Sequence, residues 1–295
     1  MFSKWSLRSA SFLLASRART QFLAITIVLC LAATGAQASQ YITIASGGVV
    51  GGCYAFGRVI CDIINRELKD QGISCIAKAT QGISYNLGAV ERGKADFGFT
   101  QAVWVAESID DPARTKVAQV LNFGEVPIVF LVRRETSVTS FSQLTSLVFN
   151  KGHKGSAGLA FTEKIMQYYN WQDLSFPDIT SYRTSQVTDA FCSAKVGAMS
   201  VVLFQPNNLL HDVINSCDVT PISMPEDLIT YMETNNQYVH RYRLPTGIYS
   251  PTQSNIDTIS SSILLVARQD LDSELVYKVT KIVREHLPQI NNLVP

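Results

Sequence analysis

A glycine-rich segment near the start of the chain holds the first residues whose types and spacing suit chemistry. Residues 46–57 read SGGVVGGCYAFG and stand between the apolar stretch YITIA and the amphipathic run RVICDIINREL. Glycines let a ligand approach the main chain closely, and the unpaired N–H groups of a helix's first turn attract an anion. The segment therefore predicts either an anion-binding loop or a tight turn that binds nothing.

Two nucleotide-binding motifs are excluded by the spacing of the glycines. Gly47, Gly48, Gly51 and Gly52 do not form GxGxxG, and no acidic residue ends the next strand to hold a ribose. The later loop NKGHKGSAG lacks the phosphate-binding pattern of a glycine followed by lysine, because Lys154 precedes its glycine. We therefore expect a ligand other than a nucleotide.

Polar residues also follow the next two predicted strands. Thr80, Ser84 and Asn86 lie in TQGISYN after the second strand, where Ser84 is at minimum a helix N-cap, and Gln101 ends the third strand. Loops at the carboxyl ends of strands in an open α/β sheet converge on one crevice, which is where such folds bind ligands. These residues are therefore expected beside the glycine-rich segment.

The second half of the chain repeats the glycine–serine loop. NKGHKGSAG places Gly152, Gly155 and Ser156 between a strand and a helix, and FQPNN follows another strand. Lys151 and Lys154 either draw an anionic ligand or are solvated loop charges. One such loop in each half favours a cleft that holds a small anion.

Residues for catalysis or metal binding are sparse. The sequence has no GxSxG motif, and His153, His211, His240 and His286 show no metal-type pairing. Cys53 begins a predicted helix, whose N-terminus would lower a thiol pKa, but no histidine or asparagine can be assigned as its partner. A secreted thiol-dependent enzyme that uses Cys53 is therefore the alternative to a binding protein.

Strands and helices alternate along most of the chain. Strands are expected at residues 41–46, 73–80, 95–101, 126–136, 146–150, 178–184, 197–204 and 219–224, and helices at 55–68, 84–93, 157–171, 185–196, 207–217, 225–234 and 271–290. Residues 245–270 are expected to be extended. This order predicts a parallel sheet covered by helices on both faces, in two lobes with a boundary near residues 132–140.

The first 38 residues predict a secretory signal peptide. Residues 1–21 carry four basic residues and no acidic one, residues 22–33 are apolar, and TGAQA supplies the small residues of a cleavage site after Ala38. As a helix the apolar run would span about 18 Å, short of the roughly 30 Å hydrocarbon core, so we expect export to the periplasm without an anchor. Cleavage leaves acidic residues in excess, which argues against nucleic acid as a partner.

Five cysteines follow the signal, namely Cys53, Cys61, Cys75, Cys192 and Cys217. Export permits disulfides, yet the number is odd and no CxxC spacing occurs. One prediction pairs Cys61 with Cys75 or Cys192 with Cys217 and leaves Cys53 free. Scattered buried thiols are the other prediction.

An ordered set of short motifs runs through the chain beyond the signal. The motifs are SGGVVGGCYAFG, TQGISYNLGAVERGKADFGFTQA, GHKGS, FQPN, LPTGIY and LLVARQDLDSELVYKVTKIV. Over residues 41–287 the chain resembles the TAXI-type solute-binding proteins of TRAP transporters. The resemblance implies an α/β, two-lobed periplasmic-binding-protein fold of type II, in which each lobe is a mainly parallel sheet flanked by helices. Lobe I would comprise residues 39–132 and 245–295, and lobe II residues 133–244.

The resemblance also implies a function and a set of contacts. A monomeric, non-enzymatic receptor would hold a small carboxylate such as glutamate or 2-oxoglutarate between its lobes and pass it to a membrane-embedded TRAP permease, with no cofactor or metal. The receptor of an ATP-driven importer, or a sensor, is the alternative within the same fold. Carried over by position, the ligand contacts would be Gly48, Gly52, Tyr54, Ser84, Asn86, Gln101, Ser156, Ala157, Pro206 and Tyr249.

The chain departs from the family pattern at three places in the expected pocket. Cys53 replaces an aliphatic or aromatic residue, the basic loop NKGHKGSAG replaces a glycine–proline-rich one, and Gln205 replaces a glycine before the proline. The ligand can therefore differ from the family's commonest one. Arg58, Arg183 and Arg243 are candidates for a carboxylate clamp, and the sequence singles out none of them.

Overall fold

The computed structural model of the protein describes residues 39–111, 117–250 and 254–293. Residues 41–295 form one compact unit, whereas the expected signal peptide and its cleavage site after Ala38 lie outside the described residues. Among the described helices, none is long and apolar enough to cross a bilayer.

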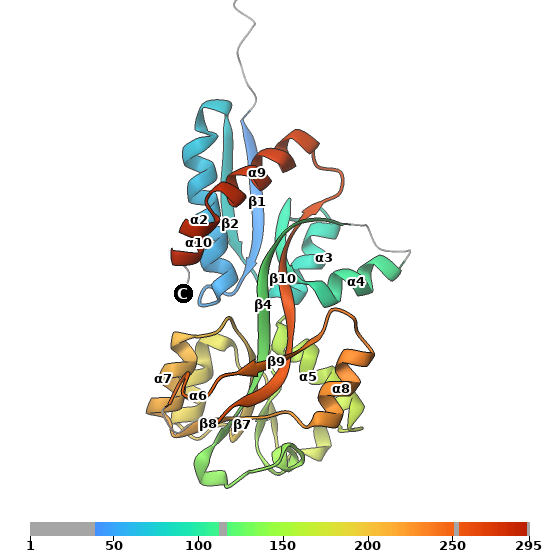
Figure 1. Ribbon diagram of the computed structural model, residues 1–295, viewed down its shortest axis with the longest axis vertical. Helices are drawn as coiled ribbons and strands as arrows, with labels where there is room; N and C mark the ends of the chain where they lie inside the picture. The colour runs from blue at the N-terminus through green and yellow to red at the C-terminus, as the bar shows by residue number, and fades with distance from the viewer. Residues whose placement is uncertain (1–38, 112–116, 251–253, 294–295) are drawn as a thin grey trace, which may run out of the picture. The chain divides into compact units, whose positions relative to one another are not determined.

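Strands lead into helices through the first series of elements. β1 (Gln40–Gly47) precedes α2 (Gly52–Glu67), β2 (Ile73–Ala79) precedes α3 (Ile83–Glu91), and β3 (Phe97–Gln101) precedes α4 (Ala102–Asp110). β1 pairs in parallel with β3, and every residue of β3 is buried, as in a central strand covered on both faces. In Figure 1, α2 and α3 lie on opposite sides of these strands.

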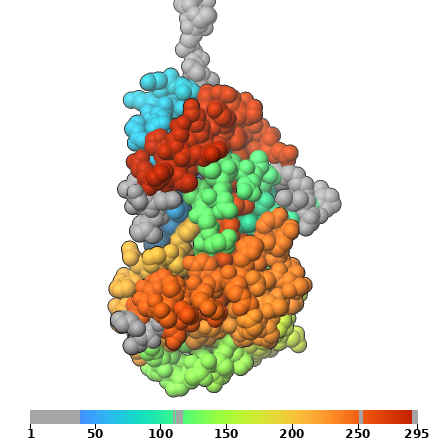
Figure 2. All heavy atoms as spheres, in the orientation of Figure 1, coloured from blue at the N-terminus to red at the C-terminus, as the bar shows by residue number. Residues whose placement is uncertain are grey.

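Two long antiparallel strands, β4 (Val117–Arg133) and β10 (Ile256–Arg268), extend through the fold in Figure 1. β10 pairs with β3 on one edge and with β4 on the other. The last residues of β4 pair instead with β7 and β8, so this strand serves both parts of the sheet. The first part of β4 alternates between exposed and half-buried residues, and Figure 2 shows its green atoms at the surface between the red C-terminal helices and the orange segment.

The second series of elements follows β4. It consists of β5 (Phe149–Asn150), α5 (Ala157–Tyr168), β6 (Ile179–Thr180), α6 (Val187–Cys192), β7 (Ala198–Val202), α7 (Asn208–Ser216), β8 (Val219–Ile222), α8 (Glu226–Thr234) and β9 (His240–Leu244). Short 3₁₀ helices lie in the connections: η1 (Lys69–Gln71), η2 (Arg134–Thr136), η3 (Phe141–Ser146), η4 (Asp173–Ser175) and η5 (Thr184–Gln186). After β10, α9 (Ser273–Glu285) and α10 (Leu287–Leu293) end the described chain.

The strands of the described residues join in the order β2-β1-β3-β10-β4-β7-β5-β6, with β8 beside β4 and β9 beside β10. β5 pairs in parallel with β6 and β7, and the antiparallel pairs all involve β4 or β10. Helices flank the strands, so the predicted α/β fold class is confirmed. The antiparallel pairs arise because β4 leads the chain from the first series to the second, and β10 leads it back in the opposite direction.

Packing and hydrogen bonds fix these elements in place. Ser156 caps α5, since its Oγ accepts a hydrogen bond from Leu159 N at 3.1 Å. One hydrophobic cluster contains both Leu87 of α3 and Phe161 of α5, so the two series share part of their core. This shared core holds the loops at the carboxyl ends of β1, β2 and β5 in a common region.

Two disulfides are present in the described chain. Cys61 pairs with Cys75, which ties α2 to β2, and Cys192 pairs with Cys217, which ties α6 to the end of α7. Cys53 is buried and free. Both predicted pairs are therefore confirmed, and the alternative of scattered thiols is wrong.

The element boundaries differ from the sequence pattern in several places. The pattern predicts neither α4, nor the first part of β4, nor β9. α4 is apolar and buried through its first turns, which removes the amphipathic period that marks a helix. β5 and β6 contain only two residues each, so the predicted strands there are too long.

Candidate functional site

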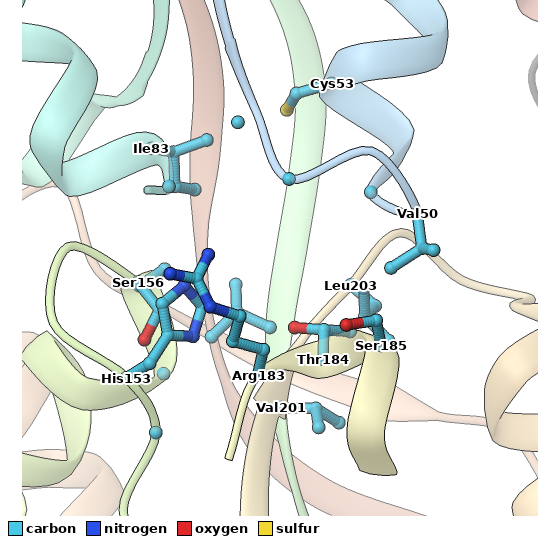
Figure 3. Close-up of a pocket in the computed structure, with 18 of the residues that line it drawn as sticks. Val50, Cys53, Ile83, His153, Ser156, Arg183, Thr184, Ser185, Val201 and Leu203 are labelled. Carbon is cyan, nitrogen blue, oxygen red and sulfur yellow. The ribbon is translucent and has the colours of Figure 1, made fainter. Parts of the chain in front are cut away.

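A cavity of about 170 Å³ lies at the carboxyl ends of β1, β2, β5, β6 and β7, beside β4 and β10. Its walls are residues 46–53, 81–83, 150, 152–153, 156–158, 182–185 and 199–204, together with Val126 and Ile263. Both series of elements thus supply loops to this cavity, and the helices α2, α3 and α5 begin at its walls. Figure 3 shows side chains from both series facing this space.

The glycine-rich segment forms the wall contributed by β1 and α2. Gly47 has a φ of +95°, and its N–H donates to Thr80 Oγ1 at 2.9 Å, which ties the loop to the end of β2. No side chain caps α2, whose N-cap residue is Gly51, so the first-turn N–H groups are not claimed by a capping side chain. The space around Gly48 is open, which leaves its backbone accessible to a ligand.

The loops after β2 and β5 touch each other across the cavity mouth. Tyr85 N donates to Gly155 O at 3.3 Å, and Ser84 Oγ donates to Ser156 O at 3.4 Å. A Cβ on Gly82 would lie 2.4 Å from Gly155 O, closer than real Cβ contacts permit. Glycine is therefore required at this crossing, and the crossing links the first series to the second.

Arg183 is the one charged side chain on the described cavity walls, and the titratable imidazole of His153 also lines the cavity. The two groups are neighbours in Figure 3, with the guanidinium directed into the space above His153. Burial lowers the pKa of His153 below its ordinary value of 6.5, and the positive charge of Arg183 lowers it further, against an opposing hydrogen bond to Gln81. His153 is therefore neutral at neutral pH, and its Nε2 lies 2.6 Å from Gln81 O.

The other basic candidates lie outside the cavity walls. Lys151 is bound by Asp173, with its Nζ 2.9 Å from both carboxylate oxygens, and Arg243 pairs with Asp257 at 2.6 Å. Arg58 and Lys154 do not line the cavity, whereas Arg183, which is exposed as they are, does. Of the three candidate arginines, Arg183 is thus the one whose position suits an anionic ligand.

Cys53 lines the cavity with a thiol that is not activated. Burial raises the pKa of Cys53 from 9.0 to about 12, and this outweighs the effect of its backbone hydrogen bond. A nucleophilic cysteine requires the opposite shift, because the thiolate is the reacting form. Among the described residues, moreover, no group of three or more His, Cys, Asp or Glu side chains gathers to hold a metal ion.

Four of the ten predicted contact residues line the cavity: Gly48, Gly52, Ser156 and Ala157. Gly52 approaches Phe204 so closely that a Cβ there would lie 2.9 Å from the ring. Ser156 Oγ is engaged as the cap of α5. The role of these four residues as ligand contacts stays a prediction.

Three other predicted contacts, Ser84, Asn86 and Gln101, lie behind the cavity walls and bind other parts of the chain. Asn86 is fully buried, its Nδ2 donating to Phe99 O at 2.9 Å and its Oδ1 accepting from Thr80 Oγ1 at 2.6 Å. Gln101 is also fully buried, and Ser84 contacts the loop after β5 as described above. These residues position the walls in this structure, and ligand contact by them stays a prediction.

Tyr54, Pro206 and Tyr249 also lie outside the cavity walls. A cis peptide bond joins Gln205 to Pro206, and the Tyr249 hydroxyl donates to Gln205 Oε1 and accepts from Asn207 N at 3.0 Å. Burial raises the pKa of Tyr249 to about 12. Tyr249 thus anchors the turn after β7, while its role and those of Tyr54 and Pro206 at a ligand stay predictions.

Several residues of the cavity walls were not predicted from the sequence. Thr184 and Ser185 follow Arg183 after β6, and Asn150 and Ser200 belong to the second series. The predicted strand over residues 178–184 includes Arg183 and Thr184, whereas β6 ends at Thr180, so the loop after β6 was not recognised beside the glycine loops. The position of that loop at the end of a strand is the signal that could have revealed it.

The arrangement of strands and helices is shared with solved solute-binding proteins. An ancestral arginine-binding protein bound to arginine superposes with a TM-score of 0.54 at 12% identity, covering 86% of this chain and 96% of that chain. PhnD1 from Prochlorococcus marinus in complex with methylphosphonate gives 0.54 at 11% identity, covering 84% and 83%. The substrate-binding protein of an amino acid ABC transporter gives 0.52 at 13% identity, covering 86% and 97%.

At these identities the superpositions establish the fold alone, which the chain shares with these three proteins. A family model for the NMT1-like family matches residues 44–295, which is most of the chain and includes both series of elements. The chain therefore belongs to the NMT1-like family.

Proposed function

We propose that the protein captures a small anionic solute in the cavity and delivers it to a membrane permease. The observation that carries this proposal is the cavity itself, enclosed by loops of both series, with Arg183 on its wall and no carboxylate among the described wall residues. Arg183 is exposed at this site and has no ion-pair partner among the described residues, so its guanidinium is available to form charge-assisted hydrogen bonds with an anion. The uncapped start of α2 adds a partial positive charge on the same wall.

The two-lobed organisation is part of the proposal. Residues 39–132 with 245–295 would form one lobe and residues 133–244 the other, joined through β4 and β10. Closure of such lobes around a solute couples occupancy to a shape that a permease can recognise. The contacts between the loops after β2 and β5 support this, because they would form only when the lobes are closed.

The partner proposed is a TRAP-type permease, and the compartment is the periplasm. The motif resemblance to TAXI-type receptors supports both, and it makes glutamate and 2-oxoglutarate the first probes to test. The receptor of an ATP-driven importer is the second candidate, because the structural neighbours include the substrate-binding protein of an amino acid ABC transporter. Solute uptake that stops when an ionophore collapses the ion gradient, at unchanged cellular ATP, favours TRAP, and the reverse dependence favours the importer.

A thiol-dependent enzyme receives less support. Catalysis through Cys53 would need a lowered thiol pKa, whereas burial raises it to about 12. The protein is therefore proposed to release its solute unchanged.

Calorimetric titration tests the proposed function. The secreted chain, freed of bound solute by denaturation and refolding with its disulfides intact, is titrated with carboxylates, sulfonates, phosphonates and acidic amino acids. Saturable binding with one site per chain is expected for at least one anion. A lack of saturable binding across the whole panel would remove the proposal.

A further inference from the structure

The polar groups of the cavity are distributed unevenly over its walls. Most of the buried polar side chains there already bind other parts of the chain. Ser46 Oγ donates to Ile44 O at 3.0 Å, Asn150 Oδ1 accepts from Tyr182 N at 2.8 Å, and Ser200 Oγ lies 2.7 Å from Thr162 Oγ1. These side chains have limited capacity left for a ligand.

The uncommitted polar groups gather on one short segment after β6. Arg183 and Ser185 are exposed and Thr184 is half-buried. Arg183 has no ion-pair partner in the described part of the chain, and the hydroxyls of Thr184 and Ser185 bind no other described residue. In Figure 3 the three side chains project from this segment, with Leu203 drawn beside Thr184 and Ser185, whereas Cys53 lies on the other side of the space. The cavity thus has one polar end.

Most of the other side chains on the walls are apolar. They are Val49, Val50, Cys53, Ile83, Val126, Ala157, Met199, Val201, Val202, Leu203, Phe204 and Ile263. Val126 of β4 and Ile263 of β10 are almost fully buried, whereas Val49 and Val50 of the glycine-rich segment are exposed. A ligand group that faces the two buried strand residues must be apolar, because a charge or an unpaired polar group buried there would be costly.

The charge balance limits the ligand further. The cavity walls contain one arginine, no lysine, no aspartate and no glutamate, and His153 is neutral at neutral pH. An ammonium group would lie beside Arg183 without a carboxylate partner, and a second carboxylate would find no second cationic side chain on the described walls. Both the zwitterionic amino acids and the dicarboxylates are therefore poorly matched.

We infer that the solute is a singly charged anion with an apolar body, whose charged end binds Arg183, Thr184 and Ser185 and whose body packs against the strand residues. This inference rests on the proposed function and narrows its substrate class. The volume limits the size, because an engineered cavity of about 150 Å³ accommodates benzene. A cavity of about 170 Å³ therefore suits a ligand of roughly six to nine non-hydrogen atoms.

Four probes of similar size separate the contributions of charge and shape. They are 4-methylpentanoate, its neutral amide 4-methylpentanamide, the dicarboxylate glutarate and the zwitterion L-leucine. Calorimetric titration of the solute-free chain should rank 4-methylpentanoate first, with each of the other three bound about 100-fold more weakly, since a mismatched charge or a lost charge-assisted hydrogen bond has this order of effect.

Variants identify the residue that binds the charge. Arg183→Gln should weaken binding of 4-methylpentanoate by about 10- to 100-fold and leave binding of the neutral amide unchanged. Arg58→Gln removes the same charge from the exposed face of α2 and is the matched control, expected to bind as the unmodified chain does. Thermal unfolding of each variant confirms that it is folded before it is titrated.

The outcomes distinguish this inference from the proposed function. Tightest binding of glutarate or L-leucine, or equal binding of acid and amide, would overturn the inference while the receptor function stands. Unchanged binding of 4-methylpentanoate by Arg183→Gln would also overturn it. If no probe binds, and the wider anion panel also fails, the receptor function itself is refuted and the inference falls with it.

Discussion

Replacing Gly82 by alanine should open the contact between the loops after β2 and β5. The new Cβ would lie 2.4 Å from Gly155 O and 2.9 Å from its carbonyl carbon, and both partners are backbone atoms that cannot rotate away. The loops must separate by about 0.6 Å or more before the Cβ–oxygen distance reaches 3.0 Å. The substitution therefore acts directly on the proposed closed state.

The magnitude follows from the hydrogen bonds that cross this contact. They join Tyr85 N to Gly155 O at 3.3 Å, Ser84 Oγ to Ser156 O at 3.4 Å, and His153 Nε2 to Gln81 O at 2.6 Å. Each contributes about 0.5 to 1.5 kcal/mol, so losing two or three costs roughly 2 kcal/mol. Affinity for the solute should then fall about 30-fold, chiefly through faster dissociation.

Backbone strain has to be separated from this effect. Gly82 has a φ of +143° and a ψ of 176°, a region that alanine adopts only at a cost of about 1 to 3 kcal/mol. That cost affects open and closed states alike, so it appears in urea denaturation and not in the affinity. Gly247→Ala is the control, because Gly247 has a φ of +74° and open space around it.

Calorimetry with the tightest-binding anion of the panel, together with urea denaturation, distinguishes the two effects in both variants. The expected result is reduced stability in both and reduced affinity in Gly82→Ala alone. An affinity of Gly82→Ala within about threefold of the unmodified chain would refute the view that these loops hold the cavity shut.

Three further predictions concern the cysteines and a histidine. Because burial raises the pKa of Cys53 from 9.0 to about 12, its thiolate fraction at pH 8 falls roughly 1000-fold, and an alkylating reagent should label it slowly in the native chain and fast in urea. Cys61→Ala with Cys75→Ala should reduce stability by about 3 kcal/mol in urea denaturation, since the disulfide closes a loop of 14 residues, and an unchanged midpoint would contradict this. Because burial lowers the pKa of His153 below 6.5, the unfolded chain takes up its proton more readily, so stability should be lost as the pH falls through 6.5. His153→Gln should flatten that part of the curve of melting temperature against pH.

The repeated strand–helix order could be predicted from the sequence because it leaves a clear periodicity. α2, α7 and α9 each present an apolar stripe between polar residues, and the strand YITIAS is short and rich in β-branched residues. α4 and β9 could not be predicted this way, since α4 is buried on several sides and β9 is exposed through most of its length. The two disulfides were within reach because each joins cysteines of adjacent elements.

The parts of the site formed by glycine-rich loops could be predicted from the sequence. The part formed by Arg183, which lies far from those loops in the sequence, could not. Gly48, Gly52 and Ser156 lie in loops whose composition alone indicates a close backbone approach. Arg183 follows a two-residue strand, and its place on the cavity wall depends on the pairing of β5 with β6 and β7. Such long-range pairing is not encoded in any local pattern of residues.

The central claim is that the cavity between the two series binds an anionic solute. A crystal structure of the chain with the tightest-binding anion from the calorimetric panel tests this most directly. We predict electron density for one solute inside the cavity, with its charged group within hydrogen-bond distance of the Arg183 guanidinium. Solute density at another place on the chain, with this cavity holding only water, would contradict the account.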